Sequence, residues 1–188
     1  QTVIPYLDEM DEAAKAIGAV NTVVNRGGKL CGYNTDFGGL KALIERTGVS
    51  VAGKKALIFG TGGTSNTASA VLGALGAKTV LKASTSGKQG AVSYREALTA
   101  HADAEILVNT TPCGMFPKLE GMAADPADFP RAKAVIDVVY NPLRTDLLQR
   151  AASLGIPCRG GLYMLVTQAI LAAEHFFDTK IPAEKAES

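Results

Sequence analysis

The chain is 188 residues long and nearly neutral, with 19 Lys and Arg residues against 18 Asp and Glu residues. This balance argues against nucleic acid and anionic membranes as partners, because both attract strongly basic surfaces. Hydrophobic residues make up 47% and charged residues 20%, as in an ordinary globular domain, and no apolar run reaches the roughly 20 residues of a membrane helix. Three widely spaced cysteines and two histidines argue against a metal site or a disulfide framework and favour a reducing, cytoplasmic location.

The apolar spacing alternates between strand and helix periods through most of the chain. From residue 54 to about residue 158, expected strands and helices follow one another in turn, which is typical of a parallel sheet with helices on both faces. The sequence therefore predicts an α/β fold with a Rossmann-like, doubly wound parallel sheet. In chain order, helices are expected at 3–16, 37–46, 64–75, 93–101, 145–154 and 162–177, and strands at 20–24, 29–33, 54–59, 79–83, 105–109, 133–139 and 156–158.

A glycine-rich loop separates the expected strand at 54–59 from the helix that follows it. Small residues permit a tight turn there, and free backbone N–H groups at the start of a helix can bind a pyrophosphate. Position 65 is Ser, so the loop departs from a strict G-x-G-x-x-G pattern, and a glycine-rich turn without a ligand is the alternative. The residues predicted to bind a dinucleotide in this loop are Gly60, Thr61, Gly62, Gly63 and Thr64.

The choice of cofactor is normally determined at the end of the second strand of such a unit. This chain has no Asp or Glu there to bind the ribose hydroxyls of NAD, and no Arg for the 2′-phosphate of NADP. Three hydroxyl residues, Ser84, Thr85 and Ser86, are predicted to contact the cofactor instead. Lys82 or Lys88 can supply positive charge, although both fit equally well as ordinary surface lysines.

Two polar clusters, Asn21-Thr22 and Asn34-Thr35-Asp36, adjoin short apolar runs near the start of the chain. Buried polar side chains are unfavourable unless they find partners, so such clusters often mark a site. Together with later motifs in the same order, these clusters make the whole chain resemble the shikimate dehydrogenase family. The motifs that carry the resemblance are Gly18–Thr22, Gly32–Asp36, Gly60–Gly63, Val108–Met115, Asp137–Pro142 and Gly161–Ala169.

The resemblance implies roles for individual residues on the substrate side. Asn21 and Asp36 would hydrogen-bond the hydroxyls of shikimate, and Asp36 would also be one half of the catalytic acid–base pair. Tyr140 would lie near the substrate carboxylate or the nicotinamide, and Gln168 would contact the substrate from the last helix. Simpler alternatives are a hairpin-turn residue for Asn21, a helix N-cap for Asp36, packing on a nearby proline for Tyr140 and a solvated helix position for Gln168.

The resemblance also implies that Asn109, Thr110, Val138 and Gly161 contact the cofactor. Thr85 stands where the family usually has an arginine, and Asn66 stands at a position that is often basic. The implied cofactor is NADP, and these two departures keep NAD possible.

The acid–base partner of the aspartate in the family is a lysine in an Asn-Val-Thr-x-Pro-x-Lys segment. No such segment occurs in the sequence, and we expect the chain to begin just after it, as an N-terminally truncated member. The expected division is a remnant of the N-terminal α/β substrate-binding domain at 1–36, a Rossmann-like NADP-binding domain at 37–160 and a C-terminal helix returning toward the substrate domain at 161–188. Since positioned proton transfer contributes about 10²–10⁴ in rate, we expect the chain alone to be weakly active or inactive.

The implied function is the NADP-dependent interconversion of 3-dehydroshikimate and shikimate in aromatic amino-acid and chorismate biosynthesis. Shikimate would be the small-molecule partner. Two alternatives stay open, namely a quinate/shikimate dehydrogenase that uses NAD and a non-catalytic nucleotide-binding module. The absent part of the substrate domain would leave apolar surface around Val20, Val23 and Leu30 without a cover, which predicts self-association through that face.

Overall fold

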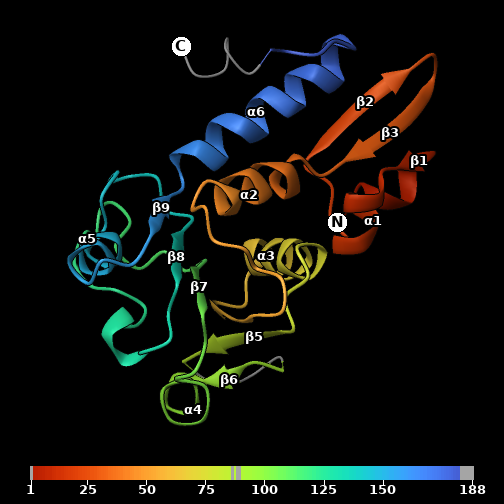
Figure 1. Cartoon of the computed structure of the whole chain (residues 1–188). Coiled ribbons are helices and arrows are strands. Elements are labelled where there is room, and N and C mark those ends of the chain that lie inside the picture. The colour runs from red at the N-terminus through yellow and green to blue at the C-terminus, as the bar shows by residue number, and fades with distance from the viewer. Residues whose placement is uncertain (1, 86, 88–89, 183–188) are drawn as a thin grey trace.

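The computed structural model describes residues 2–85, 87 and 90–182, and its elements are shown in Figure 1. Its helices are α1 (Glu12–Ile17), α2 (Thr35–Glu45), α3 (Gly63–Ala74), α4 (Tyr94–Ala100), α5 (Asp146–Ser153) and α6 (Leu162–Phe177), with short 3-10 helices η1 (Ile4–Tyr6) and η2 (Pro126–Asp128). Its strands are β1 (Glu9–Met10), β2 (Thr22–Arg26), β3 (Lys29–Tyr33), β4 (Lys55–Phe59), β5 (Thr79–Ser84), β6 (Val92–Ser93), β7 (Ile106–Asn109), β8 (Ala134–Asp137) and β9 (Cys158–Gly160).

Six strands form one parallel sheet in the order β6-β5-β4-β7-β8-β9. The first strand of the unit, β4, lies inside the sheet, with Phe59 opposite Ala83 of β5 on one side and opposite Asn109 of β7 on the other. This is the strand order of the Rossmann fold, which confirms the predicted fold class. The order reverses between β4 and β7, and ligands of such sheets bind at the carboxyl ends of the strands beside that point.

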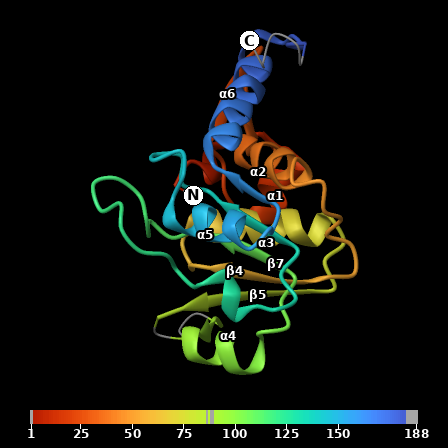
Figure 2. The same ribbon diagram turned by 60° about the vertical axis from the view of Figure 1, so that its left-hand side comes forward.

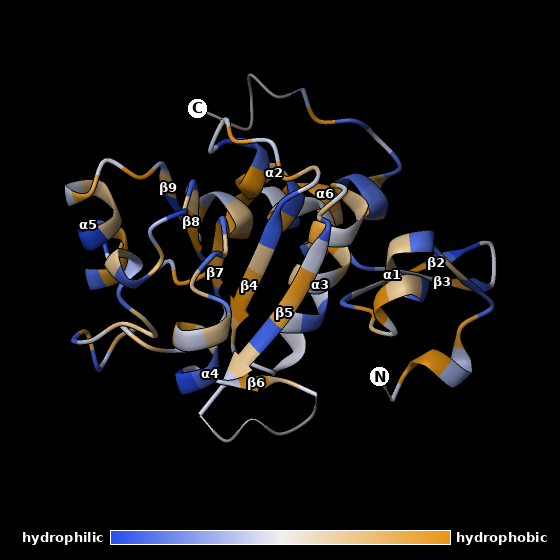
Figure 3. Cartoon of the chain, turned by 60° about the horizontal axis from the view of Figure 1, so that its bottom comes forward, coloured by the Kyte–Doolittle hydropathy of each residue, from blue (hydrophilic) through white to orange (hydrophobic). Residues whose placement is uncertain are grey.

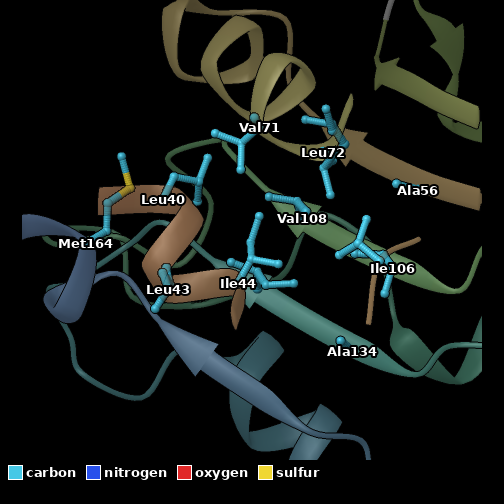
Figure 4. Packing of buried hydrophobic residues seen from close by; sticks show 14 residues of the cluster. Leu40, Leu43, Ile44, Ala56, Val71, Leu72, Ile106, Val108, Ala134 and Met164 are labelled. Atoms are coloured by element: carbon cyan, nitrogen blue, oxygen red, sulfur yellow. The ribbon is translucent and has the colours of Figure 1, made fainter. Parts of the chain in front are cut away.

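Helices cover both faces of this sheet, and Figure 2 shows the layers from the side, with α2 and α3 on one face and α4 on the other. On the first face, α2, α3 and the start of α6 pack on the strands, as Figure 4 shows. On the second face, α4, α5 and η2 contribute to a separate apolar cluster. Fully burying each large apolar side chain contributes about 1.5–3 kcal/mol, so these two clusters account for the main stabilising contacts of the domain. The largest members include Leu40, Leu43, Ile44 and Leu72 on the first face and Phe59, Leu57, Leu107 and Phe129 on the second.

The sheet strands are mostly apolar, as expected for strands covered on both faces. Figure 3 shows a hydrophilic break within the otherwise hydrophobic β5. Lys82 is the charged residue of that strand.

Residues 3–16 do not form the single helix that the sequence predicts. They form η1, then β1, which pairs in parallel with β3, and then the short helix α1. Asp8 anchors the chain to β3, because its N–H donates to the Leu30 carbonyl at 2.9 Å and its carboxylate accepts from the Leu30 N–H at 2.7 Å. Asp11 then caps α1 by accepting from the Ala14 N–H at 2.7 Å. Pairing with a distant strand has outweighed the local helical periodicity.

The other expected elements are present, with ends displaced by at most about two residues, as is usual for assigned boundaries. The N-cap expected at Ser93 is confirmed, since its hydroxyl accepts from the Glu96 N–H at 3.1 Å. No sequence pattern predicts β6 or η2, which are only two and three residues long.

Helix α6 leaves the sheet, packs along α2 and reaches the β2–β3 hairpin. The two helices approach closely because α2 carries glycines where they meet. A Cβ on Gly39 would lie 2.8 Å from the Met164 carbonyl oxygen of α6, and a Cβ on Gly38 would overlap Leu171. Near the far end of α6, the His175 ring stacks on Tyr33 with centroids 3.8 Å apart. These contacts join α6 to the hairpin, while the domain limits at 36 and 160 stay a prediction.

Candidate active site

A cavity of about 390 Å³, called cavity A here, lies where α6, α2, α3 and the loop after β8 meet. All four predicted substrate residues line it, although they lie in four separate stretches of the chain. Three of the predicted cofactor residues line the same cavity. The lining consists of Asn21, Asp36, Thr64, Val138, Tyr140, Gly161, Met164, Leu165 and Gln168. The structure therefore brings these residues together, and their individual roles remain predictions.

Asn21 lies just before β2, at the end of the hairpin opposite its turn, so it is not a turn residue of the hairpin. Its side-chain oxygen accepts hydrogen bonds from the Thr35 N–H at 3.0 Å and from the Thr22 hydroxyl at 3.1 Å. The Asn21 side chain also hydrogen-bonds Asp36. The residue thus ties the hairpin to the first turn of α2 while its exposed part faces cavity A.

Helix α2 begins at Thr35, one residue before Asp36, and this start shows which residue is the N-cap of the helix. Asn34 is the N-cap, because its side-chain oxygen accepts from the Phe37 N–H at 3.2 Å. Asn34 also donates to the Ala19 carbonyl at 3.0 Å. The alternative that Asp36 caps the helix is therefore wrong. Asp36 lies in the first turn instead, and its carboxylate is free to face the cavity.

Burial raises the pKa of the Asp36 carboxyl above its ordinary value, and the hydrogen bond from Asn21 opposes part of this rise. A buried carboxylate loses hydration, and the neutral form is favoured as a result. Such a group holds its proton to a higher pH than a surface aspartate. Perturbed carboxyl groups in a cavity are suited to proton transfer and are frequent in active sites.

The remaining substrate candidates occupy the wall and the mouth of cavity A. Gln168 is half-buried, its amide donates to the Leu165 carbonyl at 3.0 Å, and the Thr35 hydroxyl lies 3.5 Å from its side-chain oxygen. Gln168 is therefore not a fully solvated helix position. Tyr140 lies in the loop after β8 with 48% of its surface exposed, which leaves its ring available at the mouth.

Gly161 precedes α6 and touches the loop after β8. Any Cβ at this position would overlap the carbonyl group of Val138. The Gly161 N–H donates to the Val139 carbonyl at 2.9 Å. Only glycine permits this close approach, which sets the start of α6 against the wall of cavity A.

A second cavity, called cavity B here, has a volume of about 530 Å³ and lies at the carboxyl ends of β4, β5 and β7. The predicted cofactor residues in its lining are Gly60, Thr61, Ser84 and Thr85, joined by Tyr94, Cys113, Lys118, Glu120 and others that the sequence analysis did not single out. Ser86 and Lys88 lie outside the described residues. This place at the edge of the sheet is the one that doubly wound folds use for dinucleotides.

The glycine loop and the end of β5 each carry a feature that fits a dinucleotide. A Cβ at Gly62 or at Gly63 would meet no atom within 4 Å, so the backbone at the start of α3 is open to a ligand. The Ser84 hydroxyl is buried at the end of β5 beside cavity B, and it has no hydrogen-bond partner among the described residues. An unpaired buried hydroxyl is unfavourable by itself. Thr64, from the same loop as Gly60 and Thr61 of cavity B, lines cavity A.

Asn109 and Thr110 line neither cavity, in contrast to their predicted contact with the cofactor. The Asn109 side chain is 1% exposed and its amide uses its full hydrogen-bonding capacity within the protein, donating to Asp137 at 2.9 Å and accepting from Thr111. Thr110 donates its hydroxyl to the Phe59 carbonyl at 2.7 Å. Both side chains therefore hold the loop after β7 in place, and their contact with the cofactor stays a prediction.

Asp137 is a fully buried carboxylate at the end of β8 that the sequence analysis did not single out. It accepts from the Asn109 amide at 2.9 Å, from the Val139 N–H at 3.1 Å and from the Thr145 hydroxyl at 2.6 Å. Burial raises the pKa of Asp137 in spite of these three donors. The network joins β7, β8 and the N-cap of α5, and it fixes the loop that carries Val138 and Tyr140. An acidic residue at the end of an apolar run, AVID, was the signal available in the sequence.

Among the residues that the structure describes, no group of three or more His, Cys, Asp or Glu side chains could hold a metal ion. The described helices also include none that is long and apolar enough to cross a membrane.

Comparison with known proteins agrees with the fold. A scan against models of known protein families gives no match. The chain is 36% identical to the shikimate dehydrogenase (NADP(+)) of Symbiobacterium thermophilum, over 98% of this chain and 69% of that protein.

Two solved structures superpose closely on the chain. One is a chorismate mutase/shikimate 5-dehydrogenase fusion protein from Clostridium acetobutylicum, with a TM-score of 0.91 and 27% identity over 99% of this chain and 71% of that one. The other is quinate dehydrogenase from Corynebacterium glutamicum in complex with NAD, with a TM-score of 0.88 and 31% identity over 99% and 72%. With its sequence, its fold and its paired cavities in agreement, the chain belongs to the shikimate dehydrogenase family.

Proposed function

We propose that this chain interconverts 3-dehydroshikimate and shikimate with NADP as cofactor, binding the nucleotide in cavity B and the substrate in cavity A. The observation that carries the proposal is the convergence of Asn21, Asp36, Tyr140 and Gln168 in one cavity. Thr64, Val138 and Gly161 line the same cavity, so a dinucleotide that starts in cavity B can extend its nicotinamide end to the substrate.

The chemistry is the oxidation of a secondary alcohol to a ketone. The C–H bond gives up a hydride, and the O–H bond gives up a proton as the carbonyl forms. When bound, the nicotinamide supplies the hydride acceptor. Asp36 lies where it can take part in the transfer of the hydroxyl proton, and Asn21 orients it through their hydrogen bond. In the reverse direction the same carboxyl group returns the proton.

The acid–base partner of Asp36 in the family is a lysine, and the motif that carries it is absent from these 188 residues. We infer that the chain by itself turns over shikimate slowly. Addition of the corresponding segment of a relative upstream of Gln1 should restore turnover, because positioned proton transfer contributes about 10²–10⁴ in rate.

The first alternative is oxidation of quinate with NAD. Its support is the similarity to the quinate dehydrogenase of Corynebacterium glutamicum, whose structure contains NAD, together with the lack of an arginine at Thr85. Parallel assays with shikimate and quinate, each with NADP⁺ and NAD⁺, separate the two functions. The highest kcat/KM for the pair shikimate and NADP⁺ supports the proposal, and the highest value for quinate and NAD⁺ replaces it.

The second alternative is a nucleotide-binding module without catalysis, which the absence of the lysine motif favours. Measurable nucleotide binding without any turnover, even after addition of the upstream segment, would support it.

Self-association and location are also proposed here. Val20, Val23 and Leu30 are only half-buried, and we propose that this apolar face mediates self-association. A monomeric sedimentation profile at high concentration would contradict this. A reducing compartment such as the cytoplasm suits the three free cysteines.

A further inference from the structure

Lys82 is a half-buried cation in β5, and among the residues that the structure describes its hydrogen-bonded partner is the neutral amide of Asn66. Its Nζ donates to Asn66 Oδ1 at 2.6 Å. None of the ion pairs among the described residues includes Lys82. A charge that has lost part of its hydration and has no counter-charge is unfavourable, and a bound anion would correct this.

The position of this cation relates it to cavity B. Side chains of a strand alternate between its faces, so Lys82 and Ser84 lie on the same face of β5. Ser84 lines cavity B, and its buried hydroxyl has no partner. Asn66, which holds the ammonium group, belongs to the first turn of α3, next to the glycine loop. The Lys82–Asn66 pair therefore lies between β5 and the first turn of α3, two residues before the strand end at which Ser84 lines cavity B.

We propose that Lys82, held by Asn66, recognises the 2′-phosphate of NADP in this chain. The inference rests on the proposed function, because it requires the dinucleotide in cavity B. Neither Lys82 nor Asn66 is part of the lining of the cavity. The phosphate is accordingly placed at the rim, between the end of β5 and the first turn of α3.

General features of doubly wound folds support this assignment. The end of the second strand of the unit, here β5, distinguishes the cofactors, through an acidic residue on the ribose of NAD or an arginine on the 2′-phosphate of NADP. That end carries the uncharged Ser84 and Thr85. Lys82 is two residues earlier, about 7 Å along a strand, and the flexible stem of a lysine spans such a distance. The absence of an acid removes the repulsion that would select NAD.

The preference for NADP then does not depend on position 85, where the family usually has an arginine. Thr85 then contributes a hydroxyl group at most, and the charge comes from the strand interior. A lysine acts as a point charge without the bidentate geometry of arginine, so preference for NADP over NAD is expected to be salt-dependent.

The test uses small probes that differ by one phosphate. Adenosine 2′,5′-bisphosphate and 5′-AMP are titrated calorimetrically into the 188-residue chain and three variants. Lys82→Gln removes the charge. Asn66→Asp keeps the contact with Lys82 but supplies an internal counter-charge at the start of a helix, where an acid is tolerated. Lys78→Gln is the matched control, since Lys78 is an exposed lysine at the opposite end of the same strand.

We expect the unchanged chain to prefer the bisphosphate. Lys82→Gln should weaken the bisphosphate by about 10- to 100-fold, the effect of one charged hydrogen-bonding partner, while 5′-AMP changes little. Asn66→Asp should weaken the bisphosphate in the same direction without loss of thermal stability. If the Lys82–Asn66 pair has only a structural role, Asn66→Asp should give the opposite result. The Lys82 contact then becomes an ion pair, and the bisphosphate should bind as tightly as before or more tightly.

Equal loss in Lys78→Gln, or an unchanged preference in Lys82→Gln, would overturn the assignment of Lys82. The same is true if the unchanged chain does not prefer the bisphosphate. Titration of NADP⁺ and NAD⁺ into the unchanged chain keeps this failure distinct from failure of the proposed function. If NADP⁺ binds equally well with and without Lys82, the proposed function stands and the role of Lys82 is rejected. If neither dinucleotide binds, both the role of Lys82 and the proposed function are rejected.

Discussion

The side-chain oxygen of Asn21 lies 3.0 Å from the backbone nitrogen of Thr35, and this hydrogen bond ties the start of the β2–β3 hairpin to the first turn of α2. The next residue, Asp36, thereby faces cavity A beside Asn21. Two of the six motifs that make the chain resemble its family thus meet through one amide group.

Asn21→Ala should separate the hairpin from α2. The Thr35 N–H and the Thr22 hydroxyl lose their acceptor, and the expected loss in the free energy of unfolding is about 1 kcal/mol, because Asn21 is partly exposed. Urea denaturation measures this. Unchanged stability in Asn21→Ala would contradict the role given to this oxygen.

Asp36→Asn should lower kcat by about 10²–10⁴ if the carboxyl group takes part in proton transfer. The substitution removes a charge that burial disfavours, so the free energy of unfolding at neutral pH should stay the same or rise. Steady-state kinetics in the chain joined to an upstream lysine segment, with denaturation in parallel, tests both statements. Full activity in the variant would exclude Asp36 from the reaction.

The free energy of unfolding should depend on pH through the buried carboxyl group of Asp137. The folded-state pKa of Asp137 is raised above the unfolded value of about 3.9. Between those two values the folded state binds more protons than the unfolded state. The free energy of unfolding of the unchanged chain, relative to Asp137→Asn, should therefore fall as pH rises through this window and then become constant. A relative stability that rises with pH would contradict the raised pKa.

Asp137→Ala should be more harmful than Asp137→Asn. Alanine leaves the buried Asn109 amide and the Thr145 hydroxyl without their acceptor, and each unsatisfied group costs about 1–3 kcal/mol. Asparagine keeps one acceptor oxygen of similar shape. Thermal unfolding of both variants checks the order, and equal effects would mean that the network contributes little.

Gly161→Ala and Gly73→Ala should change stability in opposite directions. A Cβ at Gly161 overlaps the Val138 carbonyl, whereas a Cβ at Gly73, inside α3, meets nothing within 4 Å. The first substitution should destabilise the fold by displacing the start of α6. The second should stabilise it by about 0.5–1 kcal/mol, as alanine in place of glycine does in a helix. Similar effects at both positions would contradict the close approach at Gly161.

Most of the sheet could be predicted from the sequence, because strands such as Lys55–Phe59 are apolar runs bounded by glycine and polar turns. Residues 3–16 could not. Their helical spacing is real, but Asp8 binds Leu30, which lies 22 residues away, and no local pattern reveals such a pairing. The short β6 likewise exists only because Ala83 and Ser84 provide a partner.

In the candidate site, too, some features could be predicted from the sequence and others could not. The motifs containing Asn21, Asp36, Tyr140 and Gln168 were visible in the sequence, and the structure places all four in one cavity. The sequence does not reveal that the Asn109 side chain is buried, with its amide fully hydrogen-bonded to Asp137 and Thr111. The bond between Lys82 and Asn66 joins a strand to a helix, and only the folded chain reveals it.

The most direct test of the account is shikimate-dependent reduction of NADP⁺, followed by absorbance. It compares the 188-residue chain, the same chain joined upstream to the corresponding segment of the Symbiobacterium thermophilum relative, and that longer chain with Asp36→Asn. The account predicts turnover in the longer chain, at least 10²-fold less with Asp36→Asn, and little in the short chain. No shikimate-dependent reduction in the longer chain, or equal rates with Asp36→Asn, would contradict it.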